Sequence, residues 1–225
     1  DNSFKSIVDE WNYNRDQRIT TRAFGSLYAQ LNIGNIFPVL KGLRYRLNFG
    51  PDVSYARDGI YIDANSVANG GSTNYAALID NKIFSYTLDN LLYYDRTFGE
   101  HAFGLTLLQS QTAYQRDTSN ITGNGIPLSS QLWNQLASGT VTGQLSSSTH
   151  TIKQQLLSYM IRLNYSFKDK YLLTASARQD GSSIFAEGHK YDWFPSAALA
   201  WRISRENFMN DASWVNDLKL RVGAG

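Results

Sequence analysis

Hydrophobic and polar residues alternate along much of this chain, and the alternation is clearest in its second half. Between residues 157 and 167, every odd-numbered residue is apolar or aromatic, and all but one of the even-numbered residues are polar. Residues 171–180 and 195–204 alternate in a similar way on either side of a polar loop that contains glycine. Because successive side chains of a β-strand point to opposite faces, each segment predicts a strand with one apolar face and one polar or small face.

Shorter alternating segments predict further strands at residues 18–33, 43–49, 82–94, 103–107 and 218–222, which makes about eight strands in all. Asn90 interrupts the apolar face of segment 82–94. The connections nearly alternate in length: 34–42, 95–100 and 168–170 are short, whereas 57–80 and 115–154 are long and polar. Residues 1–16 are expected to be the tail of a loop, 181–190 and 205–216 intermediate connections, and 130–138 a short helix within the longest connection.

Alternate connections of an up-and-down sheet fall at the same end, so one end carries short turns and the other long loops. This asymmetry, with strands of about ten residues, is typical of outer-membrane barrels. Only a closed sheet satisfies its backbone hydrogen bonds in hydrocarbon. The pattern therefore predicts an all-β, up-and-down antiparallel transmembrane β-barrel. A β-sandwich or a solenoid is the alternative, although sandwich strands average about 5–6 residues.

The composition of the chain limits the classes of protein to which it can belong. Hydrophobic residues make up 42% of the chain, enough for an ordered fold, and the 14 Tyr and 11 Phe suit an apolar–aqueous boundary. The net charge of +2 is spread along the chain, which argues against nucleic acid as a partner. There is no Cys, so neither disulfides nor Cys-based metal sites are expected. The chain opens without a signal peptide and ends inside an alternating segment, so we expect it to be a fragment of a longer protein.

No catalytic constellation is visible, and we expect neither an enzyme nor a bound cofactor. His101, His150 and His189 lie far apart in turns or loops, without the spacing of a metal site. Asp180 and Asp192 could flank a glycan as a hydrolase pair does, but a turn residue and a strand start explain them better.

Three ordered motifs carry a family resemblance. They are Tyr165–Ser183 (YSFKDKYLLTASARQDGSS), Phe194–Ser204 (FPSAALAWRIS) and Asp217–Arg221 (DLKLR). Together they closely resemble the SusC/RagA-type TonB-dependent outer-membrane transporters. Ile184 and Ala186 depart from the commoner Arg and Gly after the D-G-S-S motif, which affects loop detail rather than the fold.

The resemblance implies a barrel of about 22 strands, of which residues 1–225 would supply about eight from the middle. It implies short turns in the periplasm, long loops outside the cell, and a plug domain, an N-terminal extension and remaining strands that lie elsewhere. It further implies active import of large nutrients, glycans or peptides, with a SusD-like surface lipoprotein as lid and TonB as the energy link. A passive porin-type barrel and a soluble β-rich carbohydrate-binding module are the alternatives.

Three sets of candidate residues follow. The cationic set is expected to line the lumen, or else to form ion pairs within the wall: Arg44, Arg46, Arg162, Arg178, Arg202 and Arg221. The aromatic loop set is expected to contact substrate or lid, or else to pack within the loops: Tyr55, Tyr61, Tyr75, Tyr114 and Trp133. The apolar set is expected to face outer-membrane lipid: Leu163, Tyr165, Leu173, Leu199, Trp201 and Ile203.

Overall fold

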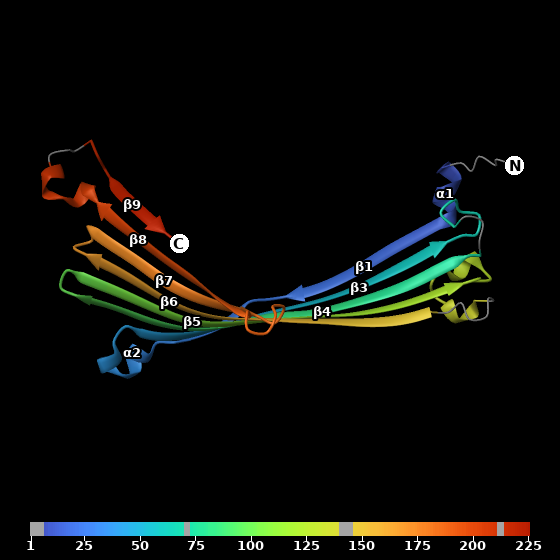
Figure 1. Cartoon of the computed structure of the whole chain (residues 1–225), viewed down its shortest axis with the longest axis horizontal. Helices are drawn as coiled ribbons and strands as arrows, with labels where there is room; N and C mark the ends of the chain where they lie inside the picture. The colour runs from blue at the N-terminus through green and yellow to red at the C-terminus, as the bar shows by residue number, and fades with distance from the viewer. Residues whose placement is uncertain (1–6, 70–72, 140–145, 211–213) are drawn as a thin grey trace. The chain divides into compact units, whose positions relative to one another are not determined.

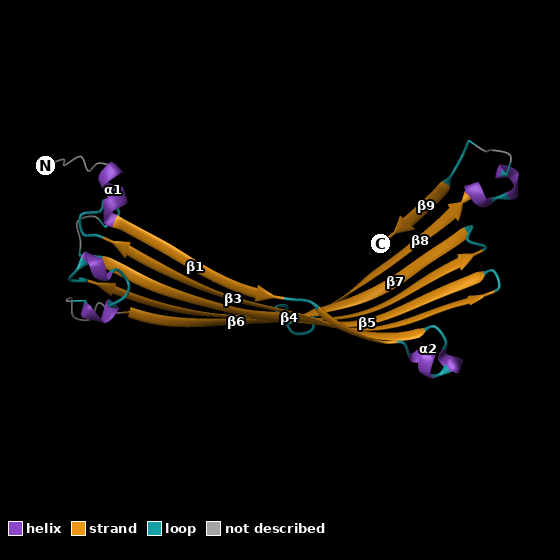
Figure 2. Ribbon diagram, turned by 180° about the vertical axis from the view of Figure 1, so that it is seen from behind, coloured by secondary structure: helices purple, strands orange, loops and turns teal. Residues whose placement is uncertain are grey.

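A computed structural model of the chain describes residues 7–69, 73–139, 146–210 and 214–225. β-Strands dominate these residues, and the helical segments are short and lie beside the strand ends (Figure 2). No helix in this part of the chain is both long and apolar enough to cross a membrane.

Nine strands form one sheet within the described residues. Their bounds are β1 Asn14–Phe24, β2 Leu27–Leu31, β3 Leu43–Ile62, β4 Tyr75–Phe98, β5 His101–Asn124, β6 Ser146–Phe167, β7 Tyr171–Ser182, β8 Tyr191–Arg202 and β9 Lys219–Ala224. The sheet order is β1, β3, β4, β5, β6, β7, β8 and β9, with β2 also paired to β3 (Figure 1). Sheet order therefore follows chain order, which confirms the expected all-β, up-and-down topology.

Helical segments occupy the connections. They are α1 Ile7–Tyr13, α2 Ile33–Ile36 and the 3-10 turns η1 Pro38–Leu40, η2 Ser129–Gln131, η3 Leu136–Ser138, η4 Ile203–Arg205 and η5 Asn207–Met209. The short helix predicted over residues 130–138 is thus replaced by two separate 3-10 turns. Residues 7–16, predicted as a loop tail, instead contain α1 and the start of β1.

Several strands extend well beyond their predicted limits. β3 continues to Ile62 and β4 begins at Tyr75, inside the predicted loop 57–80. β5 continues to Asn124 and β6 begins at Ser146, inside the predicted irregular stretch 115–154. The extensions of β5 and β6 are mostly polar, and those of β3 and β4 hold the consecutive apolar runs Ile60–Ile62 and Tyr75–Ile79, so none of them shows the apolar–polar alternation that marks a half-buried strand in a sequence. The segment 18–33 also splits at Gly25 into β1 and β2, which raises the count to nine strands among the described residues.

The chain forms two compact units, which are described separately. The first contains the residues up to Phe24 together with Asp52–Ser85 and Tyr114–Lys153. In it, β1 pairs with β3 from Asn14 opposite Ile62 to Phe24 opposite Asp52. Two ion pairs support this pairing. Arg18 pairs with the directly opposite Asp58 at 2.6 Å, and Arg22 pairs with the diagonal Asp52 at 2.5 Å.

The second unit contains Gly25–Pro51, Tyr86–Ala113 and Gln154–Gly225. It includes the antiparallel pairs β2–β3, β6–β7, β7–β8 and β8–β9. The three motifs that carry the family resemblance fall in this unit. Its turns are tight. Lys168 and Asp169 both have positive φ, and Gly42 has a φ of +93° beside the backbone carbonyl of Asp95. A Cβ at Gly42 would lie 2.0 Å from that oxygen, so this position requires glycine.

Candidate functional site

The second unit carries one apolar sheet face, and strand register defines it. Tyr165 lies opposite Leu173, Leu173 opposite Leu199, and Leu199 opposite Val222. Residues directly opposite each other in antiparallel strands project from the same face. By the same registers that face also holds Tyr159, Ile161, Leu163, Tyr171, Trp201 and Leu220.

This apolar face is exposed rather than packed against another layer. Leu199 is 58% exposed and Val222 is 68% exposed, although both lie in the middle of paired strands. A hollow of about 400 Å³, lined mainly by Tyr171, Leu173, Leu199 and Trp201, opens on it. Five of the six residues predicted to face lipid lie on this face. Ile203 does not belong to the strand, because it begins η4 after β8 has ended, so strand alternation does not place it.

The opposite face of these strands is polar. Arg162 lies opposite Ser176, and Ser176 lies opposite Ser196 with their hydroxyl oxygens 2.8 Å apart. The same registers place Arg178, Arg202 and Arg221 on this face. Four of the six predicted lumen residues therefore share one surface, as strand alternation predicts.

Three of the six residues of the cationic set form ion pairs with carboxylates. Arg178 donates to Asp180 at 2.7 Å, Arg202 to Asp169 at 2.8 Å, and Arg44 to Asp95 at 2.5 Å. Among the described residues, Arg162 and Arg221 have no such partner.

Arg46 is engaged in a different way. Its Nε donates to the side chain of Asn48 at 2.7 Å, and its guanidinium lies 4.2 Å from the centre of the Tyr28 ring. This stacking is a favourable cation–π geometry. The cationic set thus divides into four residues that are engaged by other side chains and two, Arg162 and Arg221, that have no ion-pair partner among the described residues.

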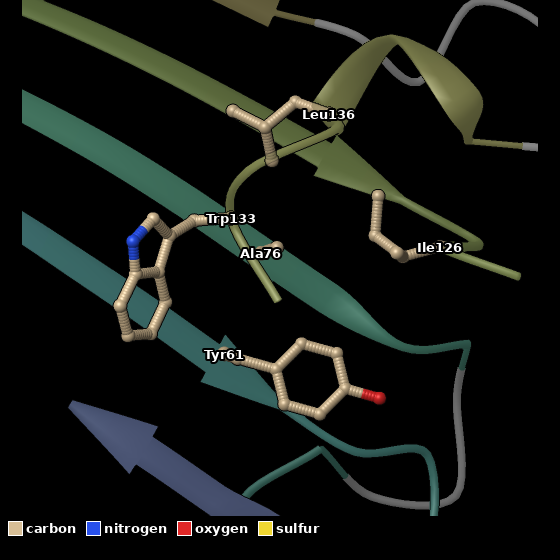
Figure 3. Close-up of a cluster of buried hydrophobic side chains, with 5 residues drawn as sticks. All are labelled: Tyr61, Ala76, Ile126, Trp133 and Leu136. Carbon is tan, nitrogen blue, oxygen red and sulfur yellow. The ribbon is translucent and has the colours of Figure 1, made fainter. Parts of the chain in front are cut away.

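The aromatic loop set is divided by burial in the first unit. Tyr61 and Trp133 lie in a cluster with Ala76, Ile126 and Leu136, which we call the loop core (Figure 3). Tyr61 is 3% exposed and Trp133 is 9% exposed. Neither ring offers a free face for a sugar in this arrangement, so the structure places these two residues in packing.

The other three aromatic residues remain accessible. Tyr55 is 42% exposed, and its hydroxyl donates to Asp80 at 2.7 Å. Tyr75 and Tyr114 are partly buried. These three residues and Tyr61 all lie within strands, so the prediction that they belong to loops was wrong for every member of the set except Trp133. The structure does not bring these three residues into a common cluster with Trp133.

A glycine on β3 makes room for the loop core. A Cβ at Gly59 would lie 2.1 Å from Trp133 Cε2, so the indole ring packs directly on the backbone. Asn74, the residue before β4, holds the same loop by two hydrogen bonds. Its Nδ2 donates to the Ile126 carbonyl at 3.0 Å, and its backbone carbonyl accepts from the Gly125 amide at 2.8 Å. The loop is therefore docked by both apolar packing and hydrogen bonds.

A carboxylate that was not singled out from the sequence ties two of the family motifs together. Glu206 accepts hydrogen bonds from Tyr171 at 2.7 Å, Trp201 Nε1 at 3.0 Å and Lys170 Nζ at 3.0 Å. We call this group the turn clasp. The hydrogen bonds from Tyr171, Trp201 and Lys170 lower the pKa of Glu206 to about 2. The sequence signal was an acid shortly after the W-R-I-S motif, but two of its three partners, Lys170 and Tyr171, lie in another motif.

A second missed carboxylate anchors α1. Glu10 accepts from Ser66, from the Val67 amide at 2.8 Å and from Asn14 at 2.7 Å. The hydrogen bond from Ser66, followed by that from Val67, lowers the pKa of Glu10 to about 2. Nothing in the alternation pattern distinguishes this residue. Within the described ranges there is no group of three or more His, Cys, Asp or Glu placed to hold a metal.

The chain is similar in sequence to TonB-dependent receptors over most of its length. No family model matches it. It is 31% identical over 201 residues to the TonB-dependent receptor SusC of Bacteroides thetaiotaomicron, covering 86% of this chain and 19% of that protein. It is 29% identical over 189 residues to the TonB-dependent receptor P3 of Formosa agariphila, covering 84% of this chain and 19% of that protein. The chain thus spans about a fifth of the length of these relatives.

Solved structures agree on the fold. The RagAB peptide transporter superposes with a TM-score of 0.83 and 20% identity, over 94% of this chain and 23% of that one. The closed-closed state of the RagAB peptide importer gives a TM-score of 0.82.

The fold and the two-faced sheet define a class: this is a stretch of an outer-membrane β-barrel from a Gram-negative bacterium. Within that class its relatives are TonB-dependent receptors that include SusC, and its fold is that of RagAB, which confirms the resemblance carried by the three motifs. These relatives are receptors rather than enzymes.

Proposed function

We propose that this chain forms part of the barrel wall of an active importer that takes large nutrients through the outer membrane with energy supplied by TonB. The observation that carries the proposal is the division of β6 to β9 into an exposed apolar face and a polar face that holds Arg162 and Arg221. The kinship with TonB-dependent receptors supports it. The polar face would border the aqueous lumen, and the apolar face would contact lipid.

All 225 residues belong to the barrel domain in this proposal. The plug domain and the segment that contacts TonB are assigned to other parts of the protein. Arg162 and Arg221 are proposed to face the plug or the solvated passage. Arg44, Arg178 and Arg202 are proposed to stabilise the wall through their ion pairs.

The cargo is proposed to be a glycan or a peptide, delivered under a SusD-like surface lipoprotein. The peptide transport named for RagAB supports a peptide, and the resemblance carried by the three motifs supports either class. Among the aromatic set, Tyr55, Tyr75 and Tyr114 retain accessible surface for cargo or lid. Tyr61 and Trp133 are proposed to act through the loop core instead.

Deletion of the full-length gene, followed by growth on defined oligosaccharides and on defined oligopeptides as sole nutrients, tests the proposal. We expect loss of growth on one class, and the same loss when TonB is inactivated in the wild type. Uptake that survives loss of TonB would favour the passive porin. Recovery of the protein in the soluble fraction would favour the carbohydrate-binding module.

A further inference from the structure

Three polar side chains that are linked by hydrogen bonds lie on the apolar face of the second unit. The Tyr45 hydroxyl donates to Asn90 Oδ1 at 2.5 Å, and Asn90 Nδ2 donates to Gln109 Oε1 at 2.6 Å. These residues come from three adjacent strands, β3, β4 and β5. Asn90 is also the residue that breaks the apolar alternation of its segment. An amide on a lipid-facing surface costs free energy unless its polar atoms find partners.

The three residues lie beside an otherwise apolar hollow. The cavity has a volume of about 380 Å³ and is lined by Tyr45, Asn90 and Gln109 together with Leu107, Tyr159 and Trp193. Strand register places Tyr159 opposite Gln179 and Gln179 opposite Trp193, so the row belongs to the same face as the lipid-facing set. The strands β4, β5, β6 and β7 that form most of the hollow are each paired on both sides. Trp193 lies at its rim, on the part of β8 that precedes the residues paired with β9.

The unused hydrogen-bonding groups of this hollow are mainly donors. The amide nitrogen of Gln109 donates to nothing among the described residues, and neither does the indole nitrogen of Trp193. Asn90 Nδ2 has a second N–H beyond the one that it gives to Gln109. A ligand that satisfies them must present an acceptor, and it must bring apolar surface for Leu107 and Tyr159.

The level of the hollow on the strand agrees with such a ligand. From Tyr159 the apolar face runs through Ile161, Leu163 and Tyr165 to Phe167 at the Lys168–Lys170 turn. At about 3.4 Å per residue and a strand tilt of about 40°, this stretch rises about 20 Å, close to the height of an outer-membrane apolar band. Tyr159 and Trp193 thus mark the edge of the band, the level at which bilayer lipids carry their ester carbonyls.

We propose that this hollow is a binding site for an ester-linked membrane lipid. The acyl chain lies along Leu107 and Ile161, and an ester carbonyl accepts a hydrogen bond from Gln109 Nε2. The occupant follows from the continuity of the hollow with the lipid-facing surface and from its excess of donors. The inference rests on the proposed membrane function, because it needs this face to meet the bilayer.

The test uses the full-length protein, purified in detergent and stripped of lipid. Native mass spectrometry then compares binding of an ester-linked phosphatidylethanolamine with its ether-linked analogue, which lacks the carbonyls. We expect the ester lipid to bind about tenfold more tightly, the equivalent of one or two hydrogen bonds. Gln109→Leu should abolish this preference. Equal binding of the two lipids by the wild type would overturn the proposal.

Two further variants keep the result interpretable. Gln111 is a matched control, because it lies two positions further along the same face of β5 and donates to Tyr86 at 3.3 Å, outside the hollow. Gln111→Leu should keep the ester preference, and its loss there would contradict the assigned site. Leu107→Trp fills the hollow and should weaken binding of both lipids; unchanged binding would also contradict it. A protein that fractionates with the outer membrane yet lacks the preference refutes the lipid site alone, whereas a soluble protein refutes the proposed function.

Discussion

Truncation of Trp133 tests whether the loop core, rather than a free aromatic platform, is the role of this residue. The indole is 9% exposed and packs on the backbone at Gly59 (Figure 3). Trp133→Ala removes that packing and leaves Tyr61, Ile126 and Leu136 around a void. The change should release the loop over residues 125–139 from the strands beneath it.

The size of the effect follows from the area that is lost. A tryptophan buries about 150–250 Å², which at about 25 cal/mol per Å² corresponds to about 4–6 kcal/mol. Large-to-small substitutions of buried aromatic residues cost about 3–5 kcal/mol. Because a surface loop relaxes more than a deep core, we take about 3 kcal/mol, which makes the open loop about a hundredfold more populated.

Hydrogen exchange on the full-length protein in detergent measures this opening directly. We expect amides over residues 125–139, including that of Gly125, to exchange up to about a hundredfold faster in Trp133→Ala. Gly59→Ala should act in the same direction, because its Cβ would displace the ring. Leu128→Ala is the matched control, since Leu128 is 59% exposed in the same loop and should leave exchange unchanged. Unaltered exchange in both Trp133→Ala and Gly59→Ala would refute the loop core as the element that holds the loop.

Two other predictions concern the second unit. Glu206→Gln should destabilise the turn clasp at neutral pH. Because the folded-state pKa of Glu206 is lowered from 4.5 to about 2, the contribution of its carboxylate to folding stability is present above pH 4.5 and fades as the pH falls towards 2. Thermal unfolding in detergent should therefore separate wild type from Glu206→Gln at pH 7 and bring the two together near pH 2, and a constant difference would contradict the assignment. Leu163→Arg, on the apolar face, should destabilise the barrel by about 2–4 kcal/mol, whereas Ser176→Arg, on the polar face, should cost little. Unfolding from lipid vesicles measures both, and equal losses of stability would contradict the assignment of one face to lipid and the other to water.

The hairpin region around β6 and β7 could be predicted from the sequence because one face of these strands is apolar and the other is polar. Residues 157–167 form the C-terminal half of β6, as predicted. The turn at Lys168–Lys170 follows where the short polar stretch predicted it. The outer halves of β3 and β5 escaped prediction. Polar residues interrupt both faces, as at Arg57 and Asp58 in β3 and at Arg116 and Asp117 in β5, so the alternation there is too irregular to mark a strand.

The candidate sites show the same limit. The parity of Arg162 and Arg221 followed from alternation, but the partners of Arg44 and Arg202 lie 51 and 33 residues away. Trp133 looked like a loop aromatic because nothing local indicates that Gly59 lies beneath it. The turn clasp likewise joins Lys170 to Glu206 across 36 residues. Such contacts depend on register, which local periodicity does not specify.

The most direct test of the account is a cysteine scan of β6 in the full-length protein in membranes. This stretch of chain contains no native cysteine, and single Cys substitutions from Tyr159 to Phe167 can carry a spin label. Collisions with oxygen report lipid, and collisions with a water-soluble nickel chelate report the lumen. We predict alternation with a period of two, with oxygen favoured at Ile161, Leu163 and Tyr165 and nickel at Met160, Arg162 and Asn164. Uniform accessibility, or the opposite parity, would contradict the assignment of the apolar face to lipid.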